Sequence, residues 1–348
     1  LGPTPEISVV THLETVEVSI EAAQEGTLGI CDICHEQVEP RLLEVDYTAT
    51  VCLEHLSPQQ VSQLESELEL AKAVQKALLP QEVPAIPGLE IAAYSRPAQF
   101  VGGDYFDFVP FRPDLPGLVI ADIAGHGISA SLHMASIQTL SRALIPTSST
   151  PAQAVERIHA LFVHNINFTT FVTLFMAAYD PSSRTLTYAN GGHNPPLLLR
   201  TCTPEPEAIF LEPTGPAIGL IEDAEYGQDE VRLEPGDLFL MYTDGVIESR
   251  APDGSMYLTE RLVKTLRRLA HLPVNEITRG IRESLDEFIQ GIPLDDDVTF
   301  VIARVVLGMM RRPNAPNAST ASCTKSSCAF TSQLIKNSTH RAVEVGRR

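Results

Sequence analysis

The sequence predicts an α+β fold in which two antiparallel β-sheets pack face to face and helices cover the outside. Its strand-like runs follow one another through short connections, which is the spacing of antiparallel neighbours. The helical segments come in pairs and do not alternate with single strands, as they would in a repeating parallel βαβ unit. With 348 residues, 44% of them hydrophobic, the chain is long enough for one large domain and a smaller one.

The elements of the large domain are expected within residues 81–307. Its strands are short runs rich in Val, Ile, Tyr and Phe between turn-forming residues, and its helices carry apolar residues every three or four positions. Strands are expected at residues 90–94, 105–109, 118–122, 171–179, 184–190, 196–200, 208–211, 230–233, 238–243 and 298–306. Helices are expected at residues 129–144, 151–165, 259–272 and 274–289.

Residues 57–80, which precede this domain, are expected to form a single linker helix. Ser57-Pro58 has the form of an N-cap followed by proline at the first helical position, and Pro80 ends the helix. Spacings of three and four residues define one face of about three heptads: Val61, Leu64, Leu68, Ala71, Gln75 and Leu78. Such a face suits a short parallel homodimer, packing onto the large domain, or a plain amphipathic linker.

Residues 1–56 are acidic and contain a set of soft metal ligands. Cys31-Asp-Ile-Cys34 is followed, after 17 intervening residues, by Cys52-Leu-Glu-His55. Paired ligands at this spacing predict a structural tetrahedral Zn²⁺ site in a small zinc-ribbon-like module. The alternatives are three reduced cysteines without metal, or His35 as a ligand. With 11 acids against one Arg, this segment suits a folding nucleus, sensor or protein-docking element better than a DNA reader.

Charge and composition exclude several classes of function. The formal charge is −19, and the last 41 residues hold seven Lys or Arg against one acid, so residues 1–307 are strongly acidic and no nucleic-acid partner is expected. No stretch is apolar over the ~20 residues of a membrane span, and no signal peptide is evident, which indicates a cytoplasmic protein with no membrane partner. Residues 308–348, rich in Ser, Thr, Asn and Pro, are expected to be a disordered tail.

A glycine-bounded apolar run delivers a carboxylate to the end of an expected strand. Four apolar side chains, residues 118–121, precede Asp122, which must be solvated, hydrogen-bonded or bound to a cation. Asp122 by itself could simply cap the turn before the next helix.

Three other segments repeat this arrangement. Asp244 ends the run 238–243, Asp295-Asp-Asp297 precedes the last strand, and Asp104 lies in Val101-Gly-Gly-Asp-Tyr-Phe-Asp107. If these carboxylates meet at one edge of a core, they raise one another's pKa values unless divalent cations neutralise them. A site with oxygen ligands only suits Mg²⁺ or Mn²⁺ rather than zinc.

Six short motifs occur in order between residues 71 and 306. They are Gln75-Lys-Ala-Leu-Leu-Pro80, Val101-Gly-Gly-Asp-Tyr105, Ala121-Asp-Ile-Ala-Gly-His-Gly127, Tyr188-Ala-Asn-Gly-Gly-His-Asn-Pro-Pro196, Tyr242-Thr-Asp-Gly245 and Asp296-Asp-Val-Thr299. Together they resemble the motifs of the bacterial PPM/PP2C-type serine/threonine phosphatases of the SpoIIE/RsbU group. The resemblance implies the α/β/β/α sandwich of the PP2C fold, and hydrolysis of phosphoserine and phosphothreonine by water activated at two Mn²⁺ or Mg²⁺ ions.

The resemblance also assigns roles to individual residues. Asp122 matches the carboxylate that bridges the two ions, and the main-chain oxygen of Ile123 contributes to one of them. Asp244 and Asp296 match the carboxylates on the other ion. Asp104 matches an acid that lies close to the ions and acts partly through water.

Three other positions are left with alternatives. His126 is either catalytic, positioning water or donating a proton to the leaving serine oxygen, or a structural turn residue. Asp297 either supports the ligands or binds an additional, third ion. Asp295 is either a ligand, with the weakest case of the three consecutive acids, or simply caps the strand. His193 is expected to shape a hairpin beside the site, and residues 215–227 correspond to a variable flap where substrate proteins dock.

The expected partner is a phosphorylated protein, an anti-sigma-factor antagonist in bacterial partner-switching signalling. By the same resemblance the helix at residues 57–80 connects a sensory module to the phosphatase and forms a homodimer. Two alternatives are a catalytically weak or inactive phosphatase-fold scaffold and, in a different class, a zinc-dependent transcription regulator that rests only on residues 31–55.

Overall fold

The structure, a computed structural model, describes residues 19–20, 22–24, 27–45, 49–125, 127–165, 170–202 and 206–307. The chain divides into two units at Gly308, and the second unit, with the expected tail 308–348, lies outside the described residues. In the described part of the chain, no helix is both long and apolar enough to span a membrane.

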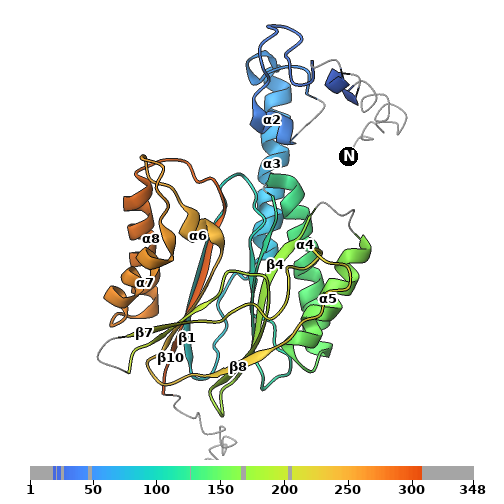
Figure 1. The fold of residues 1–348 in the computed structure, drawn as a ribbon. Helices are drawn as coiled ribbons and strands as arrows, with labels where there is room; N and C mark the ends of the chain where they lie inside the picture. Colours follow the sequence, from blue (N-terminus) through green and yellow to red (C-terminus); the bar gives the residue numbers. More distant parts are fainter. Residues whose placement is uncertain are drawn as a thin grey trace, which may run out of the picture. The chain divides into compact units, whose positions relative to one another are not determined.

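Two five-stranded antiparallel sheets form the centre of the large domain (Figure 1). One sheet has the order β1-β10-β9-β6-β7: β1 Leu89–Arg96, β10 Val298–Val305, β9 Leu238–Tyr242, β6 Leu197–Arg200 and β7 Glu207–Phe210. The other has the order β2-β3-β4-β5-β8: β2 Tyr105–Asp107, β3 Gly117–Ile123, β4 Val172–Asp180, β5 Thr185–Gly191 and β8 Asp229–Arg232. The predicted two-sheet α+β class is confirmed.

Helices cover the outer face of each sheet, as Figure 1 shows. Helices α4 (Gly127–Leu144) and α5 (Pro151–Asn165) pack on the sheet that contains β3, with the short 3₁₀ helix η2 (Ile145–Thr147) between them. Helices α6 (Asp244–Glu248), α7 (Leu258–Leu269) and α8 (Val274–Ile289) belong to the side of β1 and β10. The five-residue helix α6 was not predicted, because it is too short to show a helical period.

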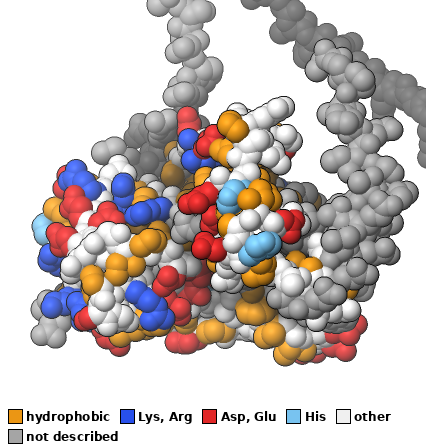
Figure 2. Space-filling view, turned by 90° about the horizontal axis from the view of Figure 1, so that it is seen from above, with side chains coloured by type: hydrophobic (Ala, Val, Ile, Leu, Met, Phe, Trp, Pro, Cys, Tyr) orange, Lys and Arg blue, Asp and Glu red, His pale blue; other side chains and the backbone are white. Residues whose placement is uncertain are grey.

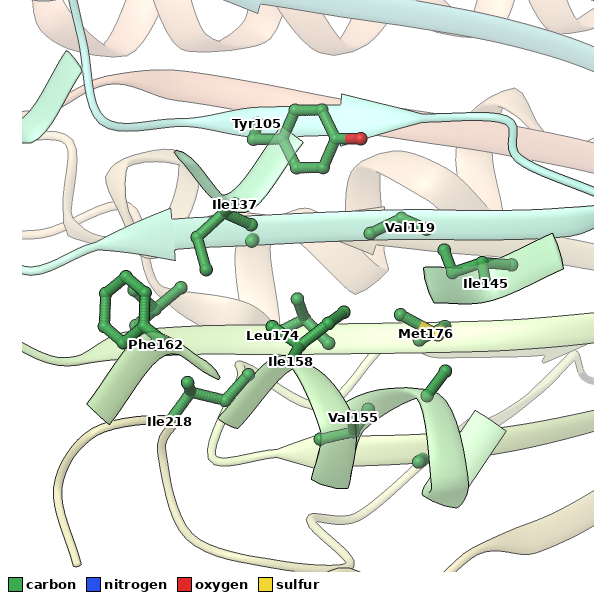
Figure 3. Packing of buried hydrophobic residues seen from close by; sticks show 14 of the residues in the cluster. Tyr105, Val119, Ile137, Ile145, Val155, Ile158, Phe162, Leu174, Met176 and Ile218 are labelled. Atoms are coloured by element: carbon green, nitrogen blue, oxygen red, sulfur yellow. The ribbon is translucent and has the colours of Figure 1, made fainter. Parts of the chain in front are cut away.

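Three apolar layers explain why the central strands read as continuous apolar runs. In β3, Val119, Ala121 and Ile123 face α4 and α5 in the layer drawn in Figure 3. Leu118 and Ile120 point the other way, into the layer between the two sheets. A third layer lies between the β1–β10 sheet and α7 and α8. Because strand side chains alternate, a strand covered on both faces needs apolar residues at every position.

The N-terminal segment contains α2 (Pro40–Val45), the 3₁₀ helix η1 (Leu53–His55) and the linker helix α3 (Pro58–Leu78). Helix α3 begins with a capping box: Ser57 Oγ accepts from the Gln60 backbone N–H, and the Gln60 side chain accepts from the Ser57 backbone N–H.

The predicted heptad face of α3 packs within the chain. Leu64 contacts the small core of the N-terminal segment, Leu68 is buried, and Leu78 contacts the core beneath α4. Gln75 exchanges two hydrogen bonds with Gly102, which lies in the loop before Asp104. This face therefore joins the N-terminal segment to the large domain.

Candidate metal-binding active site

Asp122 lies near the C-terminal end of strand β3. Asp122 is the partner of Thr173 in β4, next to the end of the strand at Ile123. Burial, followed by the nearby charges of Asp244 and Asp296, raises the pKa of Asp122 to about 8. Both causes disfavour the ionised form of the carboxyl group.

Asp244 reaches the same place from the other sheet. It is the first residue of α6, directly after β9. Burial and the neighbouring Asp296 raise the pKa of Asp244 to about 6. Its Oδ1 atom is buried and has no hydrogen-bond partner among the described residues. A buried carboxylate oxygen without a donor is an unusual and costly feature that a bound cation would remove.

Asp104, in the loop before β2, is a third acid of this group and is buried. Thr243 Oγ1 donates to its Oδ2 atom at 2.9 Å. Burial and the charges of Asp122 and Asp297 nevertheless hold the pKa of Asp104 well above its usual range.

Asp297 ties two loops together. Its Oδ1 accepts from the Ala98 backbone N–H at 2.7 Å, and its Oδ2 accepts from the Gly103 N–H at 2.6 Å. Burial raises the pKa of Asp297, while these two donors oppose the shift. A Cβ atom on Gly102 would lie 2.0 Å from Asp297 Oδ2, so only glycine leaves room for this contact.

The neighbouring Asp296 is partly exposed, and its Oδ1 accepts from the Asp297 backbone N–H at 2.8 Å. Asp295 is exposed and pairs with Arg250 at 3.4 Å. Of the three consecutive acids, Asp296 and Asp297 therefore lie among the other carboxylates, while Asp295 points to solvent.

The structure thus brings together five acids from segments almost two hundred residues apart. They are Asp104, Asp122, Asp244, Asp296 and Asp297, which influence one another's charge. Acidic side chains gather in the middle of the face shown in Figure 2. The carbonyl of the buried Ile123 lies beside Gly103, where a Cβ would be 3.0 Å from that oxygen. His126 lies outside the described residues.

Sequence analysis missed Glu248. Its charge helps to raise the pKa values of both Asp122 and Asp244. Glu248 lies four residues after Asp244, so both are on one face of α6. This spacing would have revealed it only if α6 had been predicted.

A buried turn between β5 and β6, which belong to different sheets, contacts β4 beside β3. His193 Nδ1 lies 2.8 Å from Thr173 Oγ1, and burial lowers the pKa of His193 to about 4, so the ring is neutral at pH 7. Asn190 holds the turn, because its Oδ1 accepts from the His193 backbone N–H and its Nδ2 donates to the His193 carbonyl. The hairpin expected at His193 is therefore wrong: this segment is a turn that connects the two sheets, because β5 and β6 belong to different sheets.

Comparison with known proteins identifies the domain that carries this acidic edge. The family profile of Stage II sporulation protein E (SpoIIE) matches residues 114–306. The phosphoserine phosphatase RsbU of Bacillus subtilis is 32% identical over 254 residues, which cover 72% of this chain and 74% of RsbU. The chain belongs to the SpoIIE family.

This SpoIIE-type chain therefore carries a PP2C-type phosphatase domain, as its motifs indicated. The phosphoserine phosphatase RsbP of B. subtilis is 26% identical, with 69% of this chain and 58% of RsbP covered. The PP2C domain of SiaA from Pseudomonas aeruginosa has the same fold: the TM-score is 0.62 at 24% identity, with 72% of this chain and 99% of that domain covered. The RsbU and RsbW domains of Rv1364c from Mycobacterium tuberculosis match with a TM-score of 0.57 at 27% identity, covering 66% of this chain and 64% of that one.

Outside the region of the SpoIIE match, four soft ligands form a second cluster. The ligand atoms of Cys31, Cys34, Cys52 and His55 all lie within 4.8 Å of one another. The Cys34 and Cys52 sulfurs are 3.8 Å apart, Cys31 Sγ lies 3.7 Å from His55 Nδ1, and Cys52 Sγ lies closer to that nitrogen, at 3.0 Å. Ligands on a tetrahedral zinc ion are separated by roughly 3.5 to 3.8 Å, given Zn–S and Zn–N bonds of about 2.3 and 2.0 Å.

The thiols of this cluster shift one another's pKa values in opposite directions. Burial acts to raise the pKa of Cys31, but backbone N–H donors of Cys34 and Cys52 outweigh it and lower that pKa to about 6. Burial and the adjacent Cys31 raise the pKa of Cys52 to about 11. The alternative ligand His35 is exposed and outside the cluster, where its φ of 57° serves the turn after Cys34.

Proposed function

We propose that this chain is a metal-dependent protein phosphatase that hydrolyses phosphoserine and phosphothreonine with activated water. One observation carries the proposal: Asp104, Asp122 and Asp244 converge with raised pKa values, and Asp244 Oδ1 has no donor among the described residues. Membership of a phosphatase family supports the reaction class. Intact acids at every matching position disfavour the alternative of an inactive scaffold.

The acids fit two divalent cations of the Mn²⁺ or Mg²⁺ type, because every ligand atom is an oxygen and their negative charges are uncompensated. Asp122 would bridge the ions, the Ile123 carbonyl would serve one of them, and Asp244 and Asp296 would serve the other. When bound, such ions neutralise the carboxylates, lower the pKa of water and attract the oxygens of the phosphate.

The remaining side chains hold these ligands in place. Thr243 orients Asp104, and Asp297 joins the loops that precede β2 and β10 through two backbone N–H donors. Because both of its oxygens are already bonded, Asp297 suits a supporting role better than that of ligand to a third ion. His126 stays a candidate for positioning water or donating a proton.

We also propose an anti-sigma-factor antagonist as the phosphoprotein substrate, within partner-switching signalling. RsbU and RsbP are named phosphoserine phosphatases, and Rv1364c joins an RsbU domain to an RsbW domain in one chain. A homodimer through residues 57–80 would use the side of α3 that carries the exposed Leu70 and Val74, because the heptad face is already packed.

For the N-terminal segment we propose a structural Zn²⁺ on Cys31, Cys34, Cys52 and His55, with a regulatory role for the module. The acidity of this segment disfavours the alternative of a zinc-dependent transcription regulator, which would bind nucleic acid in a salt-sensitive manner.

The decisive test is the release of p-nitrophenol from p-nitrophenyl phosphate and of phosphate from a panel of phosphorylated antagonist proteins encoded by the same genome. Both reactions should require Mn²⁺ or Mg²⁺, and both should fall at least about 100-fold in the Asp122→Asn variant. Deletion of residues 1–56 should alter the rate or its regulation without abolishing it. If the folded wild-type protein releases neither product at any Mn²⁺ concentration, the proposal is wrong and the alternative of an inactive phosphatase-fold scaffold holds.

A further inference from the structure

A basic groove lies between α7 and α8, outside the acidic site. It has a volume of about 570 Å³ and is lined on the α7 side by Arg261, Lys264 and Arg268. These residues occupy one face of the helix, and all three are exposed. Glu287 is the one acid among the residues that line the groove, so the lining is net positive in a chain of net charge −19.

The three cations differ in their contacts within the fold. Across the part of the chain that the structure describes, Lys264 and Arg268 make no ion pair, whereas Arg96, Arg142, Arg200, Arg232, Arg250 and Arg279 each do. Arg261 lies over the ring of Phe288 at 4.8 Å.

Helix stability explains only part of the arrangement. Like charges three and four residues apart destabilise a helix, and a cation near its start opposes the helix dipole. Arg268, in the last turn, fits the dipole, and Lys264 lies four residues after Glu260, which is a favourable spacing, but Arg261 near the start fits neither.

Three hydroxyl groups lie among the residues that line the groove, together with the ring of Phe288. Tyr257 OH lies 3.0 Å from Thr265 Oγ1 and 2.8 Å from Ser284 Oγ, and these two hydroxyls are 3.3 Å apart. A hydroxyl can donate to an oxygen ligand while it accepts from a neighbouring hydroxyl. Cations and hydroxyls in one lining together match carboxylate oxygens.

We propose that this groove binds an acidic segment of the phosphoprotein substrate. The inference rests on the proposed function, because it supplies the docking site that a protein phosphatase needs. The acidic edge around Asp122 repels acidic residues that flank a phosphoserine, whereas the groove attracts them. A large polyanion such as nucleic acid or an anionic membrane would meet the repulsion of the whole acidic body, but a short segment meets only the groove.

The test uses the full-length protein and two fluorescent 12-residue peptides without phosphate, one rich in Glu and the other with Gln at the same positions. The double variant Lys264→Glu/Arg268→Glu should bind the Glu peptide at least about tenfold more weakly than wild type, and binding should weaken as salt increases. The matched control Lys76→Glu/Arg112→Glu changes the net charge equally outside the groove and should keep wild-type affinity. Lys264→Gln/Arg268→Gln provides a milder version, and circular dichroism checks the fold of each.

Kinetics complete the test. The groove variant should raise the KM for phosphorylated antagonist proteins about tenfold and leave hydrolysis of p-nitrophenyl phosphate unchanged, because that small ester does not reach the groove. Equal binding of the Glu and Gln peptides, equal weakening in the control variant, or charge-dependent binding of anionic phospholipid vesicles in place of the peptide would overturn the inference. Absence of p-nitrophenyl phosphate hydrolysis in wild type would instead contradict the proposed function.

Discussion

The molecule contains two ligand clusters that are built in opposite ways. The acidic cluster collects carboxylates from residues 104–297 and stands on three apolar layers. The Cys/His cluster collects its ligands from residues 31–55, and among the described residues its own buried core consists of Cys31, Val38, Leu42 and Cys52. In the first case the fold assembles the ligands. In the second case half of the core consists of ligands, so a bound ion would assemble the fold.

The largest effect that this comparison predicts is on folding. Removing zinc with a thiol-competing chelator should unfold residues 27–56, with loss of amide protection by a factor of about 100 or more, because zinc binding supplies the folding free energy of such modules. Removing Mn²⁺ or Mg²⁺ should abolish turnover and leave residues 81–307 folded. Hydrogen exchange by mass spectrometry measures the protection of residues 27–56 and of residues 81–307 after each metal is removed.

The matched variants for this prediction are Cys34→Ser and Cys202→Ser. Cys34 belongs to the cluster, and Cys202 is an exposed free cysteine outside it. Only Cys34→Ser should lose the one zinc per chain found by elemental analysis. Native protection of residues 27–56 in metal-free protein would show that the two clusters are built alike.

A second prediction concerns Asp297, which belongs to the acidic cluster but accepts hydrogen bonds from two backbone N–H groups. Asp297→Asn keeps one acceptor and turns an amide donor toward the N–H of Ala98 or Gly103. Two donors facing each other in a buried place should cost about 1–3 kcal/mol of unfolding free energy. The Mn²⁺ concentration for half-maximal activity should rise about 10- to 100-fold, as for residues that orient metal ligands.

Denaturant unfolding and Mn²⁺ titration measure the two effects of Asp297→Asn. If activity disappears at saturating Mn²⁺ while stability stays at the wild-type value, Asp297 is a direct ligand to an additional ion.

The sequence alone predicted the class of fold, because this depends on local patterns. Apolar runs such as 118–121 mark strands covered on both faces, and the Cys-x₂-Cys and Cys-x₂-His pairs mark one compact site. The helices at residues 57–80, 151–165 and 274–289 were also predicted closely, since each has a clear start signal or long apolar period.

What the sequence could not give is the result of contacts between distant segments. Asp295, Asp296 and Asp297 have the same chemistry, and only the fold shows that Asp297 reaches the loop at Ala98 while Asp295 faces solvent. Glu248 has no motif of its own. The basic groove depends on the packing of α7 against α8, which no spacing along either helix predicts.

A third prediction uses pH in the absence of metal. Because the folded pKa values of Asp122 and Asp244, about 8 and about 6, lie above the unfolded value of ~3.9, ionisation penalises the fold. The penalty is complete above pH 8 and is relieved as pH falls through 8 and then 6. The melting temperature of the metal-free protein should therefore rise by about 5 °C or more from pH 8.5 to 5.5.

Differential scanning calorimetry with EDTA measures this slope. Saturating Mn²⁺ should flatten it, because the ions compensate the same charges, and Asp122→Asn should reduce it without metal. A metal-free slope of opposite sign, absent in Asp122→Asn, would mean that the acids are compensated within the protein itself.

The smallest effect is expected at Asp295, the acid that the fold leaves outside the cluster. Its side chain is 71% exposed, and its ion pair with Arg250 joins two exposed groups. Asp295→Asn should therefore change the equilibrium constant of unfolding and the turnover rate each by less than about twofold. Asp296→Asn, one residue along, should lower activity at least about 100-fold, because that carboxylate lies among Asp122 and Asp244. Assays of both variants over a range of Mn²⁺ concentrations separate affinity from turnover. Equal losses at the two positions would mean that total negative charge governs activity, whereas unequal losses mean that the ligand positions set by the fold govern it.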